Sequence, residues 1–446
     1  MPLRRLRDQL QSGLAELPPG PLLAAFSGGL DSSVLLHALA QSEAARARGL
    51  RAVHVDHSLH ADSASWSRQC AEFAQALGVE LIVRAVDVAR VPGLGLEASA
   101  RRARYGAIQE LLRDGEILAL AHHRGDQAET VLLKLLRGAG PEGVGAMRTL
   151  RAFGKGLAWR PLLPLPRAVL HEYADRHRLS WIQDPSNADP TIDRNYLRMQ
   201  VLPNIARRWP EAEASMAQSA TWARDAADFI ESEAERALAR TQGLDPATLR
   251  YRAWLGLPRA LRDPVLRRWL RSLALPEPTQ YQAAELVRQL GEAGEDRQPC
   301  VRWPGVEVRR YRDLLYALPP LQFPVSDWSA NFDGGELELP NGLGRVALIG
   351  DDGAPRRLDS PLVVRFRRGG ENLRLSEQGP TRELRDLFQE AGIPPWQRGR
   401  LPLLFESDDA GESLAAVADL WLGARAAERF ARAGARLEWK TTAGVP

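Results

Sequence analysis

The chain has few cysteines and no long apolar run, and each shortage excludes a class of protein. Cys70 and Cys300 are the only cysteines, which excludes a disulfide framework and any paired-cysteine zinc or redox site. No apolar stretch approaches the roughly 20 residues that span a bilayer. The N-terminus, MPLRRLRDQL, lacks the continuous apolar core of a secretion signal and predicts a short amphipathic helix. We therefore expect a cytoplasmic protein that does not associate with a membrane.

Lysine is also scarce. Of the 59 basic residues, only Lys134, Lys155 and Lys440 are lysines, and the rest are arginines. The planar arginine fork suits phosphates, but a bias spread over the whole chain is more typical of a GC-rich genome than of one binding site. The net charge of +3 does not indicate a nucleic-acid partner by itself.

Strand-like and helix-like segments alternate through the first third of the chain. The sequence predicts strands at 22–26, 51–55, 80–86 and 116–121, and helices at 32–40, 67–77, 97–113 and 127–136. This alternation is typical of an α/β fold with a doubly wound parallel sheet. In such sheets ligands bind beyond the carboxyl ends of the strands.

The pattern changes after Arg160. Helical periodicity dominates 210–290, with Trp222, Trp254 and Trp269 as predicted core anchors. Glycine, proline and β-forming residues dominate 301–349, and a proline- and glycine-marked boundary near 351–361 precedes a small α/β segment. With 446 residues, two to four domains are expected. We predict three domains, at 1–208, 209–350 and 351–446.

The strongest single motif is AAFSGGLDSS at 24–33. A strand ends at Phe26, two adjacent glycines allow backbone N–H groups to surround an anion, and a helix N-terminus follows. We predict that this loop binds a nucleotide phosphate and that Asp31 holds a magnesium ion. The alternative for Asp31 is a helix cap. The predicted phosphate-binding residues are Ser27, Gly28, Gly29, Leu30, Asp31 and Ser32.

This loop lacks the lysine of GxxxxGK[ST] and resembles the SGGxDS motif of the N-type ATP pyrophosphatases, which cleave ATP between the α- and β-phosphates. Further segments resemble the tRNA(Ile)-lysidine synthetase family in order and spacing. They are HVDHSLHADSASW at 54–66, EASARRARY at 97–105, AHHRGDQAETVLLKLLRGAGPEGVGAM at 121–147, DPSNADPTIDRNYLRMQVLP at 184–203 and the C-terminal segment at 365–404. Two residues depart from the family pattern: Arg385 replaces a lysine, and Gly125 replaces the first of two acids.

The resemblance implies a two-step ligation. The 2-oxo oxygen of the wobble cytidine (position 34) of tRNA(Ile) with a CAU anticodon attacks the α-phosphate of ATP. The amine of L-lysine then displaces AMP and leaves lysidine. The implied cofactors are ATP and Mg²⁺. Residues 1–208 would form the catalytic domain, 209–350 a mainly helical substrate-binding domain and 351–446 a tRNA-binding domain. A homodimer is compatible with the sequence.

Site residues are predicted within that chemistry. Asp31, Arg101, His122 and Asp126 are the predicted catalytic residues, and the alternative for His122 and His123 is one packed and one solvated histidine. Asp126 and Glu129 share one helix face and would accept the cytosine amine or the lysine ammonium; a solvent-facing acidic helix start is the alternative. The remaining predicted substrate-binding residues are Arg104, Ser186, Asn187, Arg194, Asn195 and Arg198. For the arginines of 97–105, ion pairs with Glu97 are the alternative.

The segment 365–400 holds eight arginines against five acids. These arginines could hold phosphates of the tRNA acceptor stem, with Trp396 stacking on a base, although for Trp396 we favour a core position.

Three other functions remain open. A tRNA cytidine thiolase would need cysteine pairs, which the chain lacks. A glutamine-dependent synthetase would need a glutaminase, and Met1-Pro2 argues against the type with an N-terminal cysteine. A non-catalytic tRNA-binding protein would have no use for an intact phosphate loop.

Overall fold

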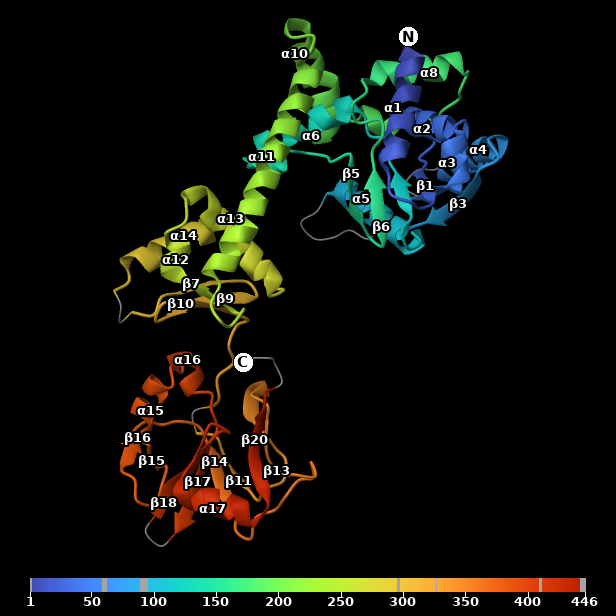
Figure 1. Ribbon diagram of the computed structural model, residues 1–446. Helices are drawn as coiled ribbons and strands as arrows, with labels where there is room; N and C mark the ends of the chain where they lie inside the picture. Colours follow the sequence, from blue (N-terminus) through green and yellow to red (C-terminus); the bar gives the residue numbers. More distant parts are fainter. Residues whose placement is uncertain are drawn as a thin grey trace. The chain divides into compact units, whose positions relative to one another are not determined.

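The computed structural model describes residues 2–57, 62–88, 95–294, 297–325, 327–408 and 411–441. Residues 58–61 of the motif at 54–66 therefore lie outside the described residues. The chain divides into two compact units, Met1–Ser232 and Glu233–Pro446 (Figure 1).

The first unit is built on one six-stranded sheet with the strand order β3-β2-β1-β4-β6-β5. All neighbouring strands pair in parallel except β5, which is antiparallel to β6. The predicted doubly wound parallel sheet is confirmed. Its strands are β1 (Leu22–Ala25), β2 (Leu50–Asp56), β3 (Glu80–Ala85), β4 (Ile117–Ala119), β5 (Leu150–Phe153) and β6 (Gly156–Trp159).

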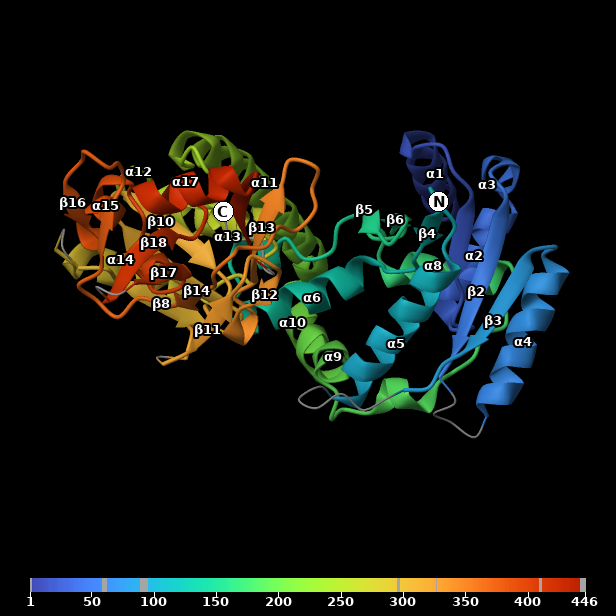
Figure 2. The same ribbon diagram turned by 90° about the horizontal axis from the view of Figure 1, so that it is seen from below.

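Helices cover both faces of this sheet (Figure 2). The first unit contains α1 (Pro2–Glu16), α2 (Leu30–Ala40), α3 (Glu43–Ala47), α4 (Ser63–Ala76), α5 (Leu96–Leu111), α6 (Arg124–Leu136), α7 (Pro141–Val144), α8 (Arg167–Arg176), the 3₁₀ turn η1 (Pro185–Ala188), α9 (Asp193–Tyr196), the π-helical turn η2 (Leu197–Val201), α10 (Leu202–Arg208) and most of α11 (Ala212–Thr241).

Alternate residues of β1 supply two separate cores. Leu22 and Ala24 pack with α1, α2, α4 and α8, whereas Leu23 packs with α5 on the opposite face. A strand that is buried on both faces reads as a continuous apolar run. This explains why β1 shows no polar alternation.

A buried ion pair joins β2 to the start of β4. The Arg51 guanidinium donates from Nε and Nη2 to the two carboxylate oxygens of Glu116, both at 2.7 Å. The side chains are 8% and 0% exposed. Because β1 lies between these two strands, the pair fixes three strands at the end of the sheet where β1 and β4 begin.

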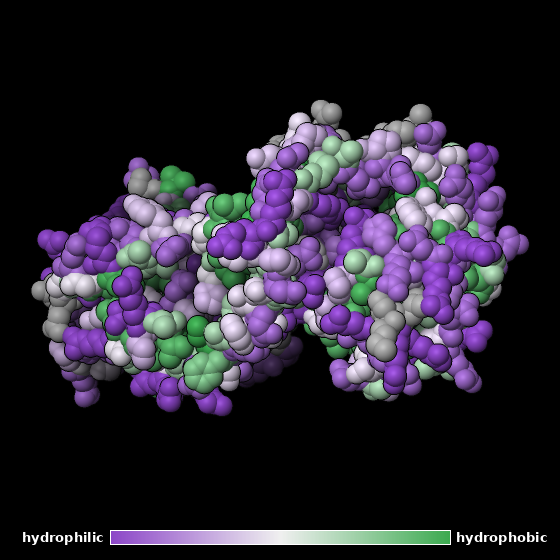
Figure 3. Space-filling model, turned by 90° about the horizontal axis from the view of Figure 1, so that it is seen from above, coloured by the Kyte–Doolittle hydropathy of each residue, from purple (hydrophilic) through white to green (hydrophobic). Residues whose placement is uncertain are grey.

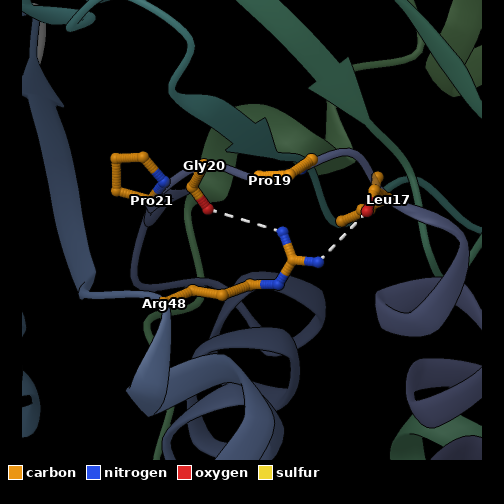
Figure 4. A pocket seen from close by; sticks show the side chains of 5 residues that line it. All are labelled: Leu17, Pro19, Gly20, Pro21 and Arg48. Atoms are coloured by element: carbon orange, nitrogen blue, oxygen red, sulfur yellow. Dashed lines mark hydrogen bonds between the residues drawn. The ribbon is translucent and has the colours of Figure 1, made fainter.

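A small pocket lies at that same end of the sheet, lined by Leu17, Pro19, Gly20, Pro21 and Arg48. Figure 4 shows the Arg48 guanidinium directed at the backbone oxygens of Leu17 and Gly20. Arg48 Nη2 also donates to the Leu14 carbonyl oxygen at 3.1 Å, one of the last carbonyl groups of α1, which lack helical partners. Ligands of parallel sheets bind at the opposite, carboxyl ends of the strands, so we assign this pocket a structural role.

The second unit combines helices with several small antiparallel sheets. The strand orders are β7-β10-β9-β8, β11-β14-β17-β18-β19, β12-β13-β20 and β15-β16. The strands are β7 (Thr248–Arg250), β8 (Cys300–Trp303), β9 (Val306–Tyr311), β10 (Leu314–Leu318), β11 (Ser329–Phe332), β12 (Leu337–Glu338), β13 (Arg345–Gly350), β14 (Leu362–Arg365), β15 (Asn372–Arg374), β16 (Thr381–Glu383), β17 (Leu403–Asp408), β18 (Gly411–Val417), β19 (Trp421–Leu422) and β20 (Ala435–Lys440). The helices are α12 (Tyr251–Leu255), α13 (Arg259–Ser272), α14 (Gln280–Glu292), the 3₁₀ turn η3 (Pro340–Gly342), α15 (Leu384–Glu390), α16 (Pro395–Arg398) and α17 (Ala424–Arg432).

Two of the three predicted tryptophan anchors are core residues. Trp254 and Trp269 are 1% and 0% exposed, and both belong to the core formed by α11–α14 and β7–β10. The prediction for Trp222 is wrong, because this side chain is 66% exposed. Ala220 is fully buried and Arg224 donates to the carbonyl groups of Gly145 and Met147. Trp222 lies halfway between Ala220 and Arg224 along α11 and therefore points away from that packed face.

Trp396 is a core residue and is not available for base stacking. It is 5% exposed, and its ring packs edge-on against Tyr311 and Tyr316 with centroid distances of 6.2 and 5.4 Å. Arg309 lies 5.5 Å from the same ring. The structure therefore agrees with the core alternative for this residue.

Hydrophilic residues dominate the face drawn in Figure 3, with hydrophobic residues visible between them. None of the helices in the described ranges combines the length and apolarity needed to cross a bilayer.

The buried pair generates a stability prediction. Glu116→Gln should destabilise the first unit by roughly 3–5 kcal/mol at pH 7, because Arg51 then stays buried without its counter-charge. Thermal melting measures this loss. Glu110→Gln is the matched control, since its pair with Arg84 at 3.0 Å is exposed and should contribute at most about 1 kcal/mol.

The same pair predicts a pH dependence. Burial favours a raised pKa for Glu116, but the hydrogen bonds from Arg51 and from the backbone N–H of Arg113 outweigh it and lower the pKa below 4.5. A lowered carboxyl pKa contributes stability above the unfolded-state pKa that is lost as the pH falls. The difference between wild type and Glu116→Gln should therefore shrink below about pH 4.5. A difference that stays constant down to pH 3 would contradict this prediction.

Candidate active site

The carboxyl edge of the first sheet brings three loops together. The neighbouring parallel strands β1, β4 and β6 end side by side. The loop at 27–29 follows β1, His122 and His123 follow β4, and Arg160 follows β6. Ligands of parallel α/β sheets bind at this edge.

The phosphate loop is closed by serine hydroxyl groups. The Ser27 and Ser32 hydroxyl oxygens lie 3.0 Å apart, and Ser32 Oγ donates to the Gly29 carbonyl oxygen at 3.0 Å. Gly29 is the N-cap of α2, and no side chain caps this helix end. The first N–H groups of α2 therefore remain available to an anion, whose charge the helix dipole favours.

Gly28 is the loop position at which a side chain cannot be accommodated. Its φ is +81°, and a Cβ atom there would lie 2.5 Å from Ile182 Cδ1 and 2.8 Å from Cys70 Sγ. Leu30, another predicted loop residue, is 4% exposed and packs in the core. Its backbone N–H, but not its side chain, can therefore face a ligand.

Asp31 stands in the first turn of α2 and reaches two other elements. Its Oδ1 lies 3.4 Å from Arg167 Nε, and its Oδ2 lies 3.9 Å from His123 Nε2. The carboxyl group is 29% exposed. It does not cap its own helix, so the structure offers no support for the helix-cap alternative.

His123 is a structural part of the site. Its Nδ1 accepts from the backbone N–H groups of Gly125 and Asp126, at 3.0 and 3.4 Å, and Asp126 Oδ2 accepts from the His123 N–H at 2.9 Å. This reciprocal capping box begins α6. The cap fixes the position of the Asp126 carboxylate relative to the end of β4.

Two acids and two arginines form a buried network beside this cap. Glu129 accepts from Arg194 Nε and Arg198 Nε, both at 2.6 Å, and Asp126 Oδ1 lies 3.3 and 3.1 Å from their Nη2 atoms. The Glu129 side chain is 2% exposed. These acids are therefore not a solvent-facing helix start. Both oxygens of Glu129 are occupied by arginine donors in this conformation, and a substrate contact for this residue stays a prediction.

The position of Arg194 and Arg198 depends on an unusual turn. The chain forms α9 and then the π-helical turn η2. π-helical turns are rare and are frequently found at functional sites. Asn195 is 7% exposed and donates to the carbonyl groups of Ser186 and Asp189, at 3.0 and 2.9 Å. Asn195 thereby shapes the loop that carries Ser186 and Asn187, both of which are exposed.

His122 is held in its neutral form. Its Nδ1 is buried and has no hydrogen-bond partner among the described residues. Burial is the main cause that lowers the pKa of His122, to about 3, and the Asp126 carboxylate offsets only part of this effect. The charges of Arg101, Arg160 and Arg194 lower the pKa further.

Arg101 and Arg104 converge on Tyr105. Their Cζ atoms lie 4.9 and 5.8 Å from the Tyr105 ring centroid, and Arg101 Nη2 donates to the Tyr105 hydroxyl at 3.4 Å. The Glu97 side chain lies outside the described residues, so the ion-pair alternative is not tested.

Three residues near this edge were not predicted from the sequence. Arg167 contacts Asp31, and Glu213 Oε2 lies 3.9 Å from Arg124 Nε. Arg160 is 3% exposed. Only Arg160 carried a local signal, because it directly follows an apolar segment that ends a strand. The other two are far from their partners in sequence.

The loop geometry predicts unequal effects for its two glycines. Gly28→Ala should destabilise the first unit by about 2–5 kcal/mol, because alanine combines a left-handed φ with a steric clash. Gly29→Ala is the control, since its Cβ would meet only Ser27 Oγ at 3.6 Å, and it should melt within about 1 kcal/mol of wild type. Thermal melting compares the two. Equal losses would contradict this geometry.

The burial of His122 also predicts that stability depends on pH. Here folding favours the neutral form of the side chain, whereas for Glu116 it favours the charged form. Because its pKa falls from 6.5 to about 3 on folding, the unfolded chain binds more protons between these values, and stability falls as the pH drops through this range. His122→Asn should therefore show a shallower decline of melting temperature between pH 6.5 and 5. His171→Asn, at an exposed position of α8, should decline like wild type. Identical slopes for His122→Asn and wild type would contradict the prediction.

Comparison with known proteins finds family matches for three ranges of the chain. A family profile described as a PP-loop domain matches residues 2–205, one described as the TilS substrate binding domain matches 249–316, and one described as the TilS substrate C-terminal domain matches 362–439. The tRNA(Ile)-lysidine synthase of Xanthomonas axonopodis pv. citri (strain 306) is 44% identical over 442 residues, covering 96% of each chain. Those of Alkalilimnicola ehrlichii and Pseudomonas aeruginosa are 42% and 41% identical, covering 96% and 94% of each chain. On this similarity over nearly the whole chain, the protein belongs to the tRNA(Ile)-lysidine synthase family.

Proposed function

We propose that this protein ligates L-lysine to the wobble cytidine of tRNA(Ile) with a CAU anticodon, through an adenylated cytidine, with conversion of ATP to AMP and diphosphate. The observation that carries the proposal is the shared sheet edge. It places an open helix N-terminus with Asp31 beside the histidines and acids that follow β4. The family membership supports the same reaction.

The phosphate loop would hold the ATP phosphates. The N–H groups at the start of α2 and the hydroxyl groups of Ser27 and Ser32 are the donors. Asp31 fits a Mg²⁺ role, because Mg²⁺ is commonly bound through one or two carboxylates together with phosphate oxygens and waters. When bound there, the ion would neutralise phosphate charge. Arg167 would keep the Asp31 carboxylate in place.

His122 would act in the first step as a neutral hydrogen-bond partner. A histidine with a pKa of about 3 is a weak base at neutral pH. Its buried and unpartnered Nδ1 suits a contact with the cytosine edge or with the reacting phosphate. Arg101 would stabilise the charge that develops as the 2-oxo oxygen attacks the α-phosphate and diphosphate leaves.

The acid–arginine network would position the nucleotide base and lysine. Burial raises the pKa of Asp126, but the positive charge of Arg194 and the backbone N–H of His123 contribute to a net lowering. This carboxylate is therefore ionised at neutral pH. Asp126 and Glu129 would accept a hydrogen bond from the lysine ammonium or the cytosine amine in place of one that Arg194 or Arg198 now donates to them. Arg104, Ser186, Asn187 and Asn195 would form the rim. Residues 209–350 would bind substrate, and the arginine-rich 351–446 would bind tRNA phosphates.

The test is AMP release from ATP. Purified protein, transcribed tRNA(Ile) with a CAU anticodon and Mg²⁺ should release AMP with lysine and with no other amino acid, and mass spectrometry should find lysine joined at position 34. Asp31→Asn should lower the rate at least about 100-fold, as expected for a group aligned with the reacting charge. Asp8→Asn, at an exposed position of α1, should match wild type. A chelator should stop release, and excess Mg²⁺ should restore it.

Each alternative function predicts a different result. AMP release that does not depend on lysine would retain the adenylation and contradict lysine as the nucleophile. An absence of release with every amino acid, together with tRNA binding, would contradict the ligase and indicate a tRNA-binding protein.

A further inference from the structure

A buried arginine at the site's edge lacks an acidic partner. Arg160 directly follows β6 and is 3% exposed. Its Nη1 donates to the Arg148 carbonyl oxygen at 2.8 Å, but its Nε has no hydrogen-bond partner among the residues that the structure describes. No ion pair joins Arg160 to a carboxylate within the residues that the structure describes. A guanidinium has five N–H donors, so this group is only partly satisfied.

The position of Arg160 places it in the active site. Ala119 of β4 pairs with Trp159 of β6, and the Leu120 N–H donates to the Trp159 carbonyl oxygen at 2.8 Å. Arg160 and His122 therefore leave neighbouring strands at the same edge. Their charges also influence each other, because Arg160 contributes to the lowered pKa of His122.

Charge is distributed unequally around His122. Asp126 and Glu129 are already paired with Arg194 and Arg198. Burial lowers the pKa of Arg160, and its neighbours include two further arginines, Arg151 and Arg101. The Tyr105 side chain shares a hydrogen bond with Arg160 but is no carboxylate.

A purely structural role does not account for these contacts. The bond from Nη1 to the Arg148 carbonyl oxygen could tie the end of β6 to the segment before β5, and the hydrogen bond with Tyr105 could tie it to α5. However, burying an arginine whose charge has no counter-ion is costly. Burial of this kind is typical of a group whose anionic partner arrives with the ligand.

We propose that Arg160 is a phosphate-binding residue of the active site, and that its guanidinium, together with that of Arg101, receives a phosphate group beside His122. This inference rests on the proposed function, because two sources supply a phosphate there. One is the α-phosphate of the nucleotide, and the other is the phosphodiester next to the wobble cytidine. Arginine suits either source, because its fork can donate two parallel hydrogen bonds to phosphate oxygens.

Binding measurements test the proposal without requiring turnover. Wild type, Arg160→Gln and the control Arg151→Gln are titrated by calorimetry with AMP, with adenosine and with an anticodon stem-loop RNA. Arg151 is exposed on β5. Its replacement by glutamine removes a nearby positive charge and leaves the buried Arg160 guanidinium in place. Arg160→Gln should bind AMP or the RNA roughly 10- to 100-fold more weakly, the effect of losing a hydrogen bond to a charged group. Adenosine binding and the Arg151→Gln protein should be unchanged.

The two ligands distinguish the two phosphate sources. Weaker AMP binding alone assigns Arg160 to the nucleotide, and weaker RNA binding alone assigns it to the tRNA backbone. Unchanged affinity for both ligands in a folded Arg160→Gln protein would overturn the proposal.

Two further controls keep the result decisive. If Arg160→Gln does not fold, Arg160→Lys keeps the charge but loses the fork, and it should still weaken phosphate binding about tenfold; unchanged binding would overturn the proposal. If wild type makes no lysidine but Arg160→Gln still loses phosphate affinity, the proposed function fails while the phosphate site stands.

Discussion

The parallel register of β1, β4 and β6 is the constraint on which the rest of the site depends. These strands are only three or four residues long, so their carboxyl ends coincide within a small area. A shift of one residue would exchange the side chains that pack on the two faces of the sheet. The phosphate loop, both histidines and Arg160 owe their proximity to this pairing, although up to 133 residues separate them in the sequence. The buried pair of Arg51 and Glu116 reinforces it at the opposite end of the sheet.

The site beyond the sheet is organised by charge rather than by apolar packing. Asp126 receives bonds from the cap of α6 and from two arginines, and Glu129 receives bonds from the same arginines. The two carboxylates and the two guanidinium groups therefore neutralise each other's charge within this largely buried network. Such a network costs little reorganisation during a reaction, because its dipoles are already oriented. A cationic substrate must therefore compete with Arg194 and Arg198. An anionic one meets Arg160, whose Nε has no partner among the described residues.

Much of this arrangement could be predicted from sequence, and the remainder required tertiary contacts. The loop at 27–32 and the strand ends are local features, because glycines, apolar runs and helix starts are written in consecutive residues. The exposure of Trp222 could not be predicted, since helical periodicity does not specify which face of α11 packs. The burial of Trp396 follows from Tyr311 and Tyr316, about 80 residues earlier in the chain. The capping role of His123 depends on its side-chain orientation, which the sequence does not specify.

The surroundings of Gly125 explain how the site tolerates a glycine where the family pattern has the first of two acids. A Cβ atom at this position would lie 2.9 Å from the His123 ring and 3.7 Å from Glu213 Oε1. A side chain here would displace the imidazole that caps α6. The carboxylate of Glu213, carried by α11, already lies next to the space that an acid at position 125 would occupy. Negative charge is therefore present at this place although the motif lacks its first acid, and it is supplied by a residue 88 positions later. Sequence motifs record which residue usually supplies a charge, whereas the chemistry of a site depends on where the charge lies.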